Sequence, residues 1–321
     1  MTQTIYVTGA AGMIGSVFCH EALSKGYKVV GIDNLSRGKY ENLAPFLENG
    51  NFAFMHSDIS SDFEWANSIS DSDIIVHLAD IVGGIGYVLS NEWSVFNQNL
   101  RINSNLARVI NLRRPRQLVY VGTACSYPKA LQRTVDRSGL LEADKFPADP
   151  ESGYGWSKLI GDIEYSLLCK TNGVAYTNLD LHNVYGSPCD FNPATAQVIP
   201  SLVYKALTTE QLVVWGSGEQ GRAFVEVRDV AVAIMAAITR CIPGSYMIGP
   251  SICTTINDVA KLLLGNPKTK AKTVFNDLSK PVGDIGRYYS GSAAHQILGW
   301  KPEISIEQGI CDLVDYIDRR L

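Results

Sequence analysis

A tyrosine and a lysine stand four residues apart, at Tyr154 and Lys158, in a segment whose apolar spacing predicts a helix. Side chains at this spacing share one helix face, so the hydroxyl and the ammonium lie one turn apart. An ammonium beside a phenol favours the phenolate, which removes a proton from an alcohol near neutral pH. The pair predicts proton transfer to or from a sugar hydroxyl, although the same spacing is also typical of a solvated helix face.

Thr123 and Cys125 follow directly after a predicted strand, Gln117 to Val121. Ligands of open parallel sheets bind at the carboxyl ends of the strands, so both side chains are candidates for the same site as Tyr154. We expect Thr123 to share the substrate hydroxyl with Tyr154. Cys125 has two open interpretations: a thiol that transfers protons, or a small buried side chain, as most unpaired cysteines are.

Glycines form a pattern where the first predicted strand, TIYVT, meets the first predicted helix, in the sequence GAAGMIG. Gly9 allows a tight turn, Gly12 lets the backbone approach a pyrophosphate, and Gly15 lets the helix pack on the strand. The N-terminus of that helix supplies oriented N–H groups to an anion. The pattern predicts a dinucleotide site.

Asp33 directly follows the second predicted strand, where the ribose of an adenosine would lie. A carboxylate there accepts from a 2′-hydroxyl and repels a 2′-phosphate, which favours NAD over NADP. Arg37 is the counter-indication, because a guanidinium suits a phosphate. We therefore expect NAD, with NADP as the alternative.

Short β-branched runs alternate with longer amphipathic segments over the first 180 residues, which predicts a doubly wound parallel α/β sheet of the Rossmann type. The expected strands are Thr4 to Thr8, Lys28 to Ile32, Asn51 to His56, Ile74 to His77, Gln117 to Val121 and Thr177 to Leu181. The expected helices are Met13 to Lys25, Val95 to Leu112 and Tyr154 to Thr171.

A second, smaller α/β region is expected from residue 185 onward, with a helix over Ile199 to Leu207. Residues 211–227 predict two strands joined by a glycine-rich turn, and the tail from Thr254 predicts two or three short helices. We expect an NAD-binding domain over 1–184, with 222–248 returning to it. The substrate-binding domain then comprises 185–221 and 249–321.

The chain has 321 residues, 46% of them hydrophobic, and a net charge of −4, which is typical of a soluble globular protein and argues against nucleic-acid binding. Its longest apolar stretch is interrupted by polar residues, so no membrane span is expected. The first residues resemble a strand and not a signal peptide, which favours a cytoplasmic location. Seven cysteines without a CxxC motif predict neither a disulfide framework nor a metal site.

Several motifs together resemble the extended short-chain dehydrogenase/reductases that modify nucleotide sugars, over nearly the whole length. They are TGxxGxxG, Asp33, Asp58-Ile59, HLA at 77–79, Thr123, YxxxK, HNVYG at 182–186 and GWKP at 299–302. Within that family, VGGIG at 82–86, ACSYP at 124–128 and VWGSG at 214–218 are most similar to GDP-mannose 3,5-epimerase and GDP-fucose synthase.

The resemblance implies that Tyr154 removes a hydroxyl proton while a hydride passes to tightly held NAD, which leaves a 4-keto sugar. It implies cofactor contacts from Gly9, Gly12, Met13, Ile14, Gly15, Asp33, Asn34, Arg37, Asp58, Ile59, Leu78, Ala79, Asn99, Tyr154 and Lys158. It implies contacts to a nucleotide-diphosphate sugar, with a GDP-sugar favoured, from Gly83, Gly84, Thr123, Cys125, Ser126, Asn183, Gln197, Val198, Lys205, Arg222 and Arg287.

The resemblance also implies that Cys125 deprotonates the carbon beside the ketone. The second acid/base of the similar enzymes aligns with Gln197, whose amide transfers no protons at ordinary pH. Either another group or water acts on that face, or the chain performs reduced chemistry, such as inversion at one carbon or oxidation and reduction alone. A second departure is Ser290, where the family usually has aspartate.

Four functions stay open at this point. The most favoured is epimerisation beside a transient 4-ketone, at carbon 3 or 5 or both. The second is a 4-epimerase or 4-oxidoreductase. A 4,6-dehydratase is less favoured because Ala124 and Cys125 replace its acidic pair, and a non-catalytic NAD-sensing scaffold is disfavoured by Thr123, Tyr154 and Lys158.

We also expect a homodimer through the helices Val95 to Leu112 and Tyr154 to Thr171, with Leu100, Leu106, Ile110, Leu159, Ile160 and Leu167 as its apolar surface.

Overall fold

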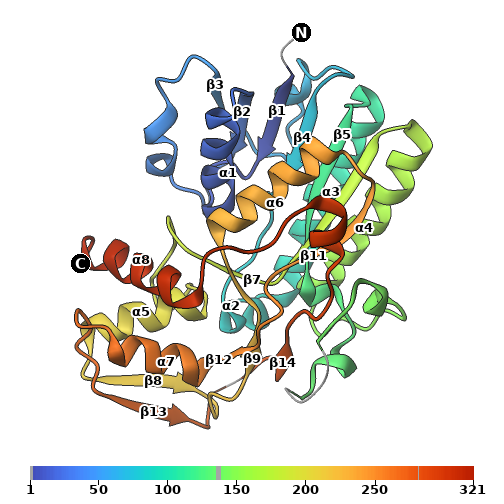
Figure 1. The fold of residues 1–321 in the computed structure, drawn as a ribbon. Helices are drawn as coiled ribbons and strands as arrows, with labels where there is room; N and C mark the ends of the chain where they lie inside the picture. The colour runs from blue at the N-terminus through green and yellow to red at the C-terminus, as the bar shows by residue number, and fades with distance from the viewer. Residues whose placement is uncertain (1–2, 135–138, 281) are drawn as a thin grey trace.

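The computed structural model describes residues 3–134, 139–280 and 282–321 and contains a seven-stranded sheet in the upper part of Figure 1. Its strand order is β11-β6-β5-β4-β1-β2-β3, and every neighbouring pair is parallel. Because the chain runs outward from β1 in both directions, the fold is doubly wound, as the sequence predicts. The strands are β1 Thr4–Thr8, β2 Lys28–Asp33, β3 Phe52–His56, β4 Ile74–His77, β5 Gln117–Thr123, β6 Ala175–Leu181 and β11 Gly244–Ile248.

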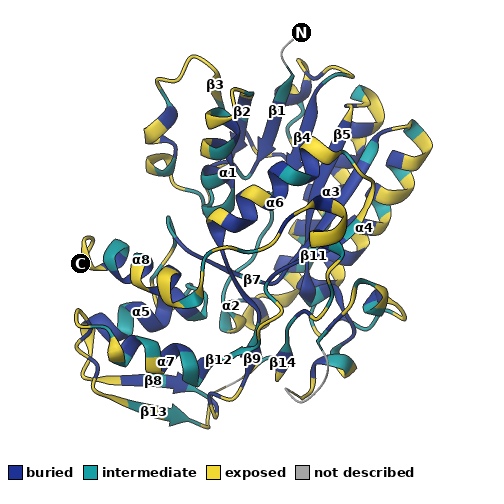
Figure 2. Cartoon of the chain, viewed as in Figure 1, coloured by how far each residue is buried: buried dark blue, intermediate teal, exposed yellow. Residues whose placement is uncertain are grey.

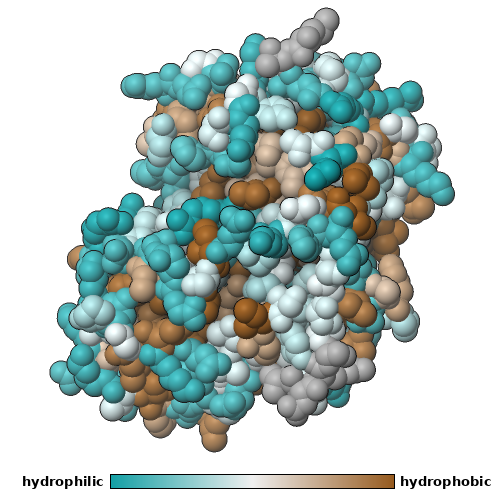
Figure 3. Space-filling view, in the orientation of Figure 1, coloured by the Kyte–Doolittle hydropathy of each residue, from teal (hydrophilic) through white to brown (hydrophobic). Residues whose placement is uncertain are grey.

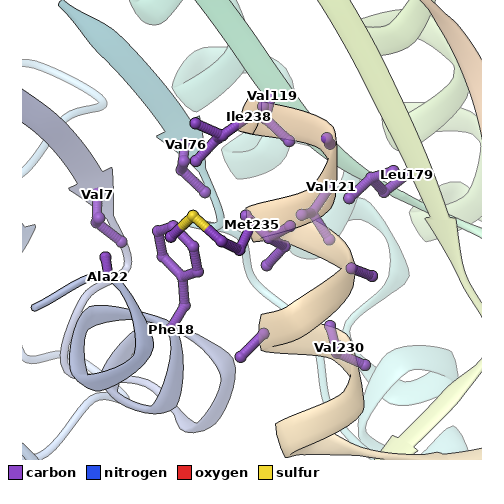
Figure 4. Close-up of a cluster of buried hydrophobic side chains, with 14 of the residues drawn as sticks. Val7, Phe18, Ala22, Val76, Val119, Val121, Leu179, Val230, Met235 and Ile238 are labelled. Carbon is purple, nitrogen blue, oxygen red and sulfur yellow. The ribbon is translucent and has the colours of Figure 1, made fainter. Parts of the chain in front are cut away.

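Helices cover both faces of this sheet. On one face, α1 (Met13–Ser24) and α6 (Val227–Arg240) pack together over a cluster that includes Phe18 and Met235, drawn in Figure 4. On the other face, α3 (Glu92–Arg113) and α4 (Gly153–Asn172) bury Tyr120 and Tyr165. Figure 2 shows that the outward sides of these helices are exposed. With both faces covered, the carboxyl edge of the sheet stays available for a ligand.

The outer surface of α3 and α4 differs from the one expected for a dimer. Leu106, Ile110 and Leu159 are at most 1% exposed, because they pack against the chain's own core. They cannot contribute to a dimer interface, so that part of the prediction is wrong. The apolar side chains that α4 does expose are Trp156, Ile160, Ile163 and Leu167.

The chain after β6 forms the lower part of the molecule. Here β8 (Gln211–Trp215) pairs in parallel with β13 (Thr273–Asp277), and β10 (Phe224–Glu226) pairs with β7 (Asn183–Tyr185). The two-residue strand β9 (Gly221–Arg222) lies between β12 (Thr254–Thr255) and β14 (Gly286–Arg287). Strands do form at both ends of residues 211–227, as predicted, but they pair with other segments and not with each other. Local alternation of apolar residues does not reveal that the partners of β8 and β9 come from the distant tail.

Helices α5 (Val198–Thr208), α7 (Ile256–Gly265) and α8 (Ile306–Asp318) build a separate core around β8. The tail helices agree with the sequence prediction. Within that tail, however, Ala294, Leu298 and Trp300 join the cluster under α6, and the Trp300 indole donates to the Asp229 carbonyl over 2.8 Å. Through these contacts, this part of the tail packs against the helix layer that covers the sheet.

Short elements complete the chain: α2 Ile85–Ser90, the 3₁₀ turns η1 Tyr40–Asn42, η2 Ala44–Phe46, η3 Glu64–Ala66, η4 Ala124–Ser126, η5 Lys129–Gln132 and η6 Glu142–Lys145, and the π turn η7 Ala294–Leu298. None of the helices in the described ranges is both long and apolar enough to cross a bilayer. Figure 3 shows hydrophobic residues in the middle and the lower part of this face, with hydrophilic residues around most of the rest of it.

Candidate active site

A cavity of about 390 Å³ lies at the carboxyl edge of the sheet. It extends from the start of α1, past the ends of β4, β5 and β6, to α5, β8 and β9. Thr123, Cys125, Tyr154 and Lys158 all line it. The structure thus brings together the four residues that the sequence marks for chemistry, although they come from segments about thirty residues apart.

The glycine-rich turn precedes α1 and has the geometry that a dinucleotide needs. Gly9 has φ +74°, and a Cβ there would lie 2.9 Å from the Ala79 nitrogen. A Cβ on Gly15 would lie 2.8 Å from the Ala10 Cα, so only glycine allows this packing of helix on turn. No side chain caps the start of α1 at Gly12, which leaves the first N–H groups of the helix for a phosphate. The residues present fit NAD.

Asp33 ends β2 beside this turn. Its carboxylate accepts from the Ala11 N–H at 3.0 Å and from the Leu35 N–H at 2.8 Å, while burial raises its pKa. Asp58 accepts from the Asn34 amide at 3.2 Å, so these predicted cofactor residues form one polar edge. Arg37 points elsewhere: its guanidinium lies 5.2 Å from the centre of the Tyr87 ring.

The remaining cofactor candidates divide into two groups. Met13, Ile14 and Leu78 line the cavity, whereas Ile59 is 5% exposed within the core of the sheet. Asn99 is 1% exposed, and its amide bonds both the N–H and the carbonyl of Ile81. Asn99 therefore positions the loop after β4 and is not among the residues that line the cavity.

Tyr154 and Lys158 meet a third ionisable group that sequence reasoning missed. The Asp80 Oδ2 atom lies 3.2 Å from the Tyr154 hydroxyl and 3.0 Å from the Lys158 ammonium, which also donates to the Val121 carbonyl at 2.8 Å. Burial, and then Asp80 and Cys125, raise the pKa of Tyr154 well above its ordinary value. This is opposite to the lowering expected from Lys158 alone.

Thr123 and Cys125 occupy the end of β5 and the turn η4. Thr123 accepts from the Cys125 N–H at 3.2 Å, which fixes the two side chains relative to each other. The Cys125 sulfur accepts from Arg287 Nη1 at 3.0 Å, and Arg287 also pairs with Asp284. Cys125 is half-buried and lines the cavity, in contrast to a residue enclosed in the core.

Two guanidinium groups, Arg222 and Arg287, line the lower side of the cavity. Burial and the neighbouring Arg287 lower the pKa of Arg222 to about 9. His182 also lines the cavity, and both of its ring nitrogens are buried without a hydrogen-bond partner among the described residues. Burial, Arg287 and Arg222 lower the pKa of His182 to about 3, so this ring is neutral. The surplus of positive charge suits a diphosphate.

Most of the other predicted substrate residues also line the cavity, namely Gly83, Gly84, Asn183, Gln197, Val198 and Lys205. Ser126 does not. It is 2% exposed, and its hydroxyl donates to the Gly155 carbonyl over 3.4 Å, so it joins η4 to α4. No cluster of metal-ligating side chains occurs in the part of the chain that the structure describes.

A doubly wound sheet, a dinucleotide turn and a Tyr/Lys pair at the same sheet edge define the class of extended short-chain dehydrogenase/reductases. More specifically, residues 5–249 match the model of the NAD dependent epimerase/dehydratase family, and the chain belongs to that family. It is therefore an enzyme, and its cofactor is NAD.

Known relatives span almost the whole chain. GDP-mannose 3,5-epimerase 1 of Oryza sativa subsp. indica is 24% identical, covering 95% of this chain and 79% of its own length. GDP-L-fucose synthase of Escherichia coli (strain K12) is 26% identical, covering 96% of this chain and 94% of its own length. The crystal structure of UDP-glucose 4-epimerase from Thermotoga maritima with UDP-glucose has a TM-score of 0.85 and 26% identity, covering 99% of both chains.

Proposed function

We propose that this enzyme modifies a nucleotide-diphosphate sugar through a transient 4-keto intermediate. The observation that carries the proposal is the convergence of Thr123, Tyr154 and Lys158 on one cavity that reaches the start of α1. NAD, when bound, supplies an acceptor for the hydride of the sugar carbon and returns it later. Thr123 and Tyr154 hold the sugar hydroxyl, Tyr154 moves its proton, and Lys158 provides the positive charge beside it.

The nucleotide end of the substrate is assigned to the lower side of the cavity. Arg222 and Arg287 offer guanidinium donors to the two phosphates, and Asn183 lines the same cavity. Lys205, 5.8 Å from the centre of the Trp215 ring, adds a cation on the same side. Our preference for a GDP-sugar rests on the motifs shared with enzymes that act on GDP-sugars.

We further propose inversion at a carbon beside the ketone, with Cys125 as the acid/base. A ketone acidifies the neighbouring carbons, and a thiol two residues from Thr123 is within reach of them. Arg287 donates to the sulfur at 3.0 Å and stabilises the negative charge that develops there when the thiol gives up its proton. Gln197 has no transferable proton, so inversion is restricted to one carbon unless water serves the second face.

A 4-epimerase is the second candidate, in which Thr123, Tyr154 and Lys158 suffice and Cys125 has no chemical role. The neutral amide at Gln197 favours it, as does the 26% identity with a 4-epimerase solved with UDP-glucose. The two candidates differ in one observable. Inversion beside the ketone exchanges a carbon-bound hydrogen with solvent, whereas inversion at carbon 4 retains it.

The test is a panel of GDP-, UDP-, CDP- and dTDP-sugars incubated with the enzyme in deuterated water, followed by mass spectrometry and NMR of the sugar. We expect deuterium at carbon 3 or 5 of one sugar. Cys125→Ser should abolish this uptake and retain hydride transfer, while Cys311→Ser on α8 serves as the control. Uptake that survives Cys125→Ser, or product without uptake, refutes the role of Cys125 and leaves the 4-epimerase.

We also propose a cytoplasmic homodimer. Trp156, Ile160, Ile163 and Leu167 form an apolar stripe along α4, between 38% and 63% exposed. Their spacing of four, three and four residues places them on one helix face, which a second copy would cover. This stripe replaces the buried leucines as the proposed contact surface.

A further inference from the structure

Asp80 is the unexpected member of the Tyr154 and Lys158 pair. It lies on the loop after β4, and the same oxygen, Oδ2, contacts the Tyr154 hydroxyl at 3.2 Å and the Lys158 ammonium at 3.0 Å. The loop is held in place by the two hydrogen bonds between Asn99 and Ile81. Because an ionised carboxylate only accepts hydrogen bonds, Tyr154 directs its hydroxyl proton toward Asp80.

This orientation changes what Tyr154 can do. Its pKa lies well above the ordinary value, through burial first and then through the negative charge of Asp80. A tyrosine that keeps its proton cannot act as a base toward an alcohol until that proton has somewhere to go. Its oxygen can still accept a hydrogen bond from the sugar hydroxyl, on the side away from Asp80.

We propose that Asp80 accepts the proton of Tyr154 while the sugar is oxidised, and returns it when the sugar is reduced. The inference rests on the proposed function. The sugar O–H bond breaks and its proton passes to the Tyr154 oxygen, while the Tyr154 O–H bond breaks and its proton passes to Asp80. The hydride leaves the same sugar carbon for the cofactor, so the sugar loses one proton and one hydride in total.

The other ionisable groups around Tyr154 do not compete for this role. Lys158 is a cation that already donates to Val121 and Asp80. His77, behind the pair on β4, bonds Thr8 through Nδ1 at 2.7 Å, and burial with Lys158 lowers its pKa to about 3. Tyr120 on β5 donates to the Lys158 carbonyl. Cys125 faces Arg287, which leaves Asp80 as the acceptor in hydrogen-bond contact with the Tyr154 hydroxyl.

The first test is the pH profile of hydride transfer in a single turnover, with the sugar that the panel identifies. With Asp80 as the acceptor, the Tyr154 proton can leave without ionisation of Tyr154 into solvent, so the wild-type rate should be flat between about pH 6 and pH 9. Asp80→Asn has no carboxylate to accept the Tyr154 hydroxyl proton, so that proton leaves only when Tyr154 ionises. The rate should fall about 10²-fold near neutral pH and rise about tenfold per pH unit.

Three variants separate this role from a structural one. Asp80→Glu keeps a carboxylate and should restore a flat profile, and Asp80→Ala should behave like Asp80→Asn if the variants fold. Glu48→Gln alters an exposed carboxylate before β3, outside the cavity, and its profile should match the wild type. A flat, wild-type profile in both Asp80→Asn and Asp80→Ala overturns the proposal and leaves the proposed function intact. Failure of the wild-type enzyme with every sugar overturns the function itself.

A second readout needs no turnover. Ultraviolet titration of tyrosinate, with Tyr154→Phe subtracted, follows Tyr154 alone. Asp80→Asn removes the carboxylate and keeps Lys158, so the titration of Tyr154 should move to lower pH. Glu48→Gln should leave this titration unchanged. An unchanged titration in Asp80→Asn shows that Asp80 does not govern the Tyr154 proton and overturns the proposal.

Discussion

Replacement of Lys145 is the change for which the structure predicts the largest loss of stability. It ends η6, on the segment between β5 and α4 that carries Cys125, and its ammonium is 2.7 Å from Asp162 and 2.6 Å from Asp180. The three side chains are 7%, 12% and 1% exposed. Burial alone would lower the pKa of Lys145, but the two carboxylates outweigh it and raise the pKa.

Lys145→Met keeps the length of the side chain and removes its charge. Two carboxylates then share a buried site with neutral donors only, the Tyr127 and Tyr176 hydroxyls and the Asn178 amide. Breaking a buried ion pair by removing one partner costs about 3–5 kcal/mol, and we expect a loss in that range near neutral pH. Lys129→Met is the matched control, since the Lys129–Asp149 pair is about half exposed and should contribute at most about 1 kcal/mol.

The loss should depend on pH in a defined direction. Burial raises the pKa of Asp180, whereas Lys145 opposes that rise, so removal of Lys145 raises it further. An acid whose pKa is raised on folding binds protons in the folded state, and stability then falls as pH rises through that pKa. The deficit of Lys145→Met should therefore shrink from pH 7 toward about pH 5.

Urea unfolding of both variants at several pH values measures these differences. Adding Asp180→Asn to Lys145→Met removes one of the uncompensated charges and should recover part of the loss. A Lys145→Met variant that loses no more stability than Lys129→Met would refute the reasoning. A deficit that grows on acidification would refute the assigned charges.

Three other predictions follow from separate features. Gly15→Ala places a Cβ against Gly9 and Ala10, and this overpacking costs about 1–3 kcal/mol. NAD binding, measured by calorimetry, should weaken about 5- to 150-fold. Gly50→Ala is the control, because a Cβ there has no atom within 4 Å and should not affect NAD binding. Tyr154→Phe should lower turnover about 10²-fold and retain NAD, and near-normal turnover would contradict the mechanism. Ile160→Glu on the exposed stripe should convert a dimer to a monomer by light scattering, and a monomeric wild-type chain would contradict the proposed interface.

The sheet could be predicted from sequence because each strand and helix carries its own local pattern. Strands β1 and β4 have the predicted bounds, and the motif residues Tyr154, Lys158 and Thr123 meet because parallel strands share a carboxyl edge. Pairings between distant segments leave no such local signal. Neither the parallel partner of β8 nor the contact between Arg287 and Cys125, 162 residues apart, could be derived from spacing.

The contacts of Asp80 are a second example, within the site, of what the sequence pattern does not reveal. Its proximity to HLA at residues 77–79 was a usable signal, since that motif ends at the sheet edge. The sequence could not indicate that one carboxylate oxygen would contact both Tyr154 and Lys158, because that contact depends on the path of the loop that Asn99 holds. The direction of the Tyr154 pKa shift was missed because the sequence shows neither the burial of Tyr154 nor its contact with Asp80.

The central claim is that a nucleotide sugar passes through a ketone at carbon 4. It is tested most directly by supplying the reactive sugar of the panel with deuterium at carbon 4 and quenching the enzyme within a single turnover. The account predicts a primary isotope effect and deuterium on the nicotinamide ring of the released cofactor, both lost in Tyr154→Phe. Product formed from the labelled sugar with neither an isotope effect nor deuterium on the cofactor would contradict it.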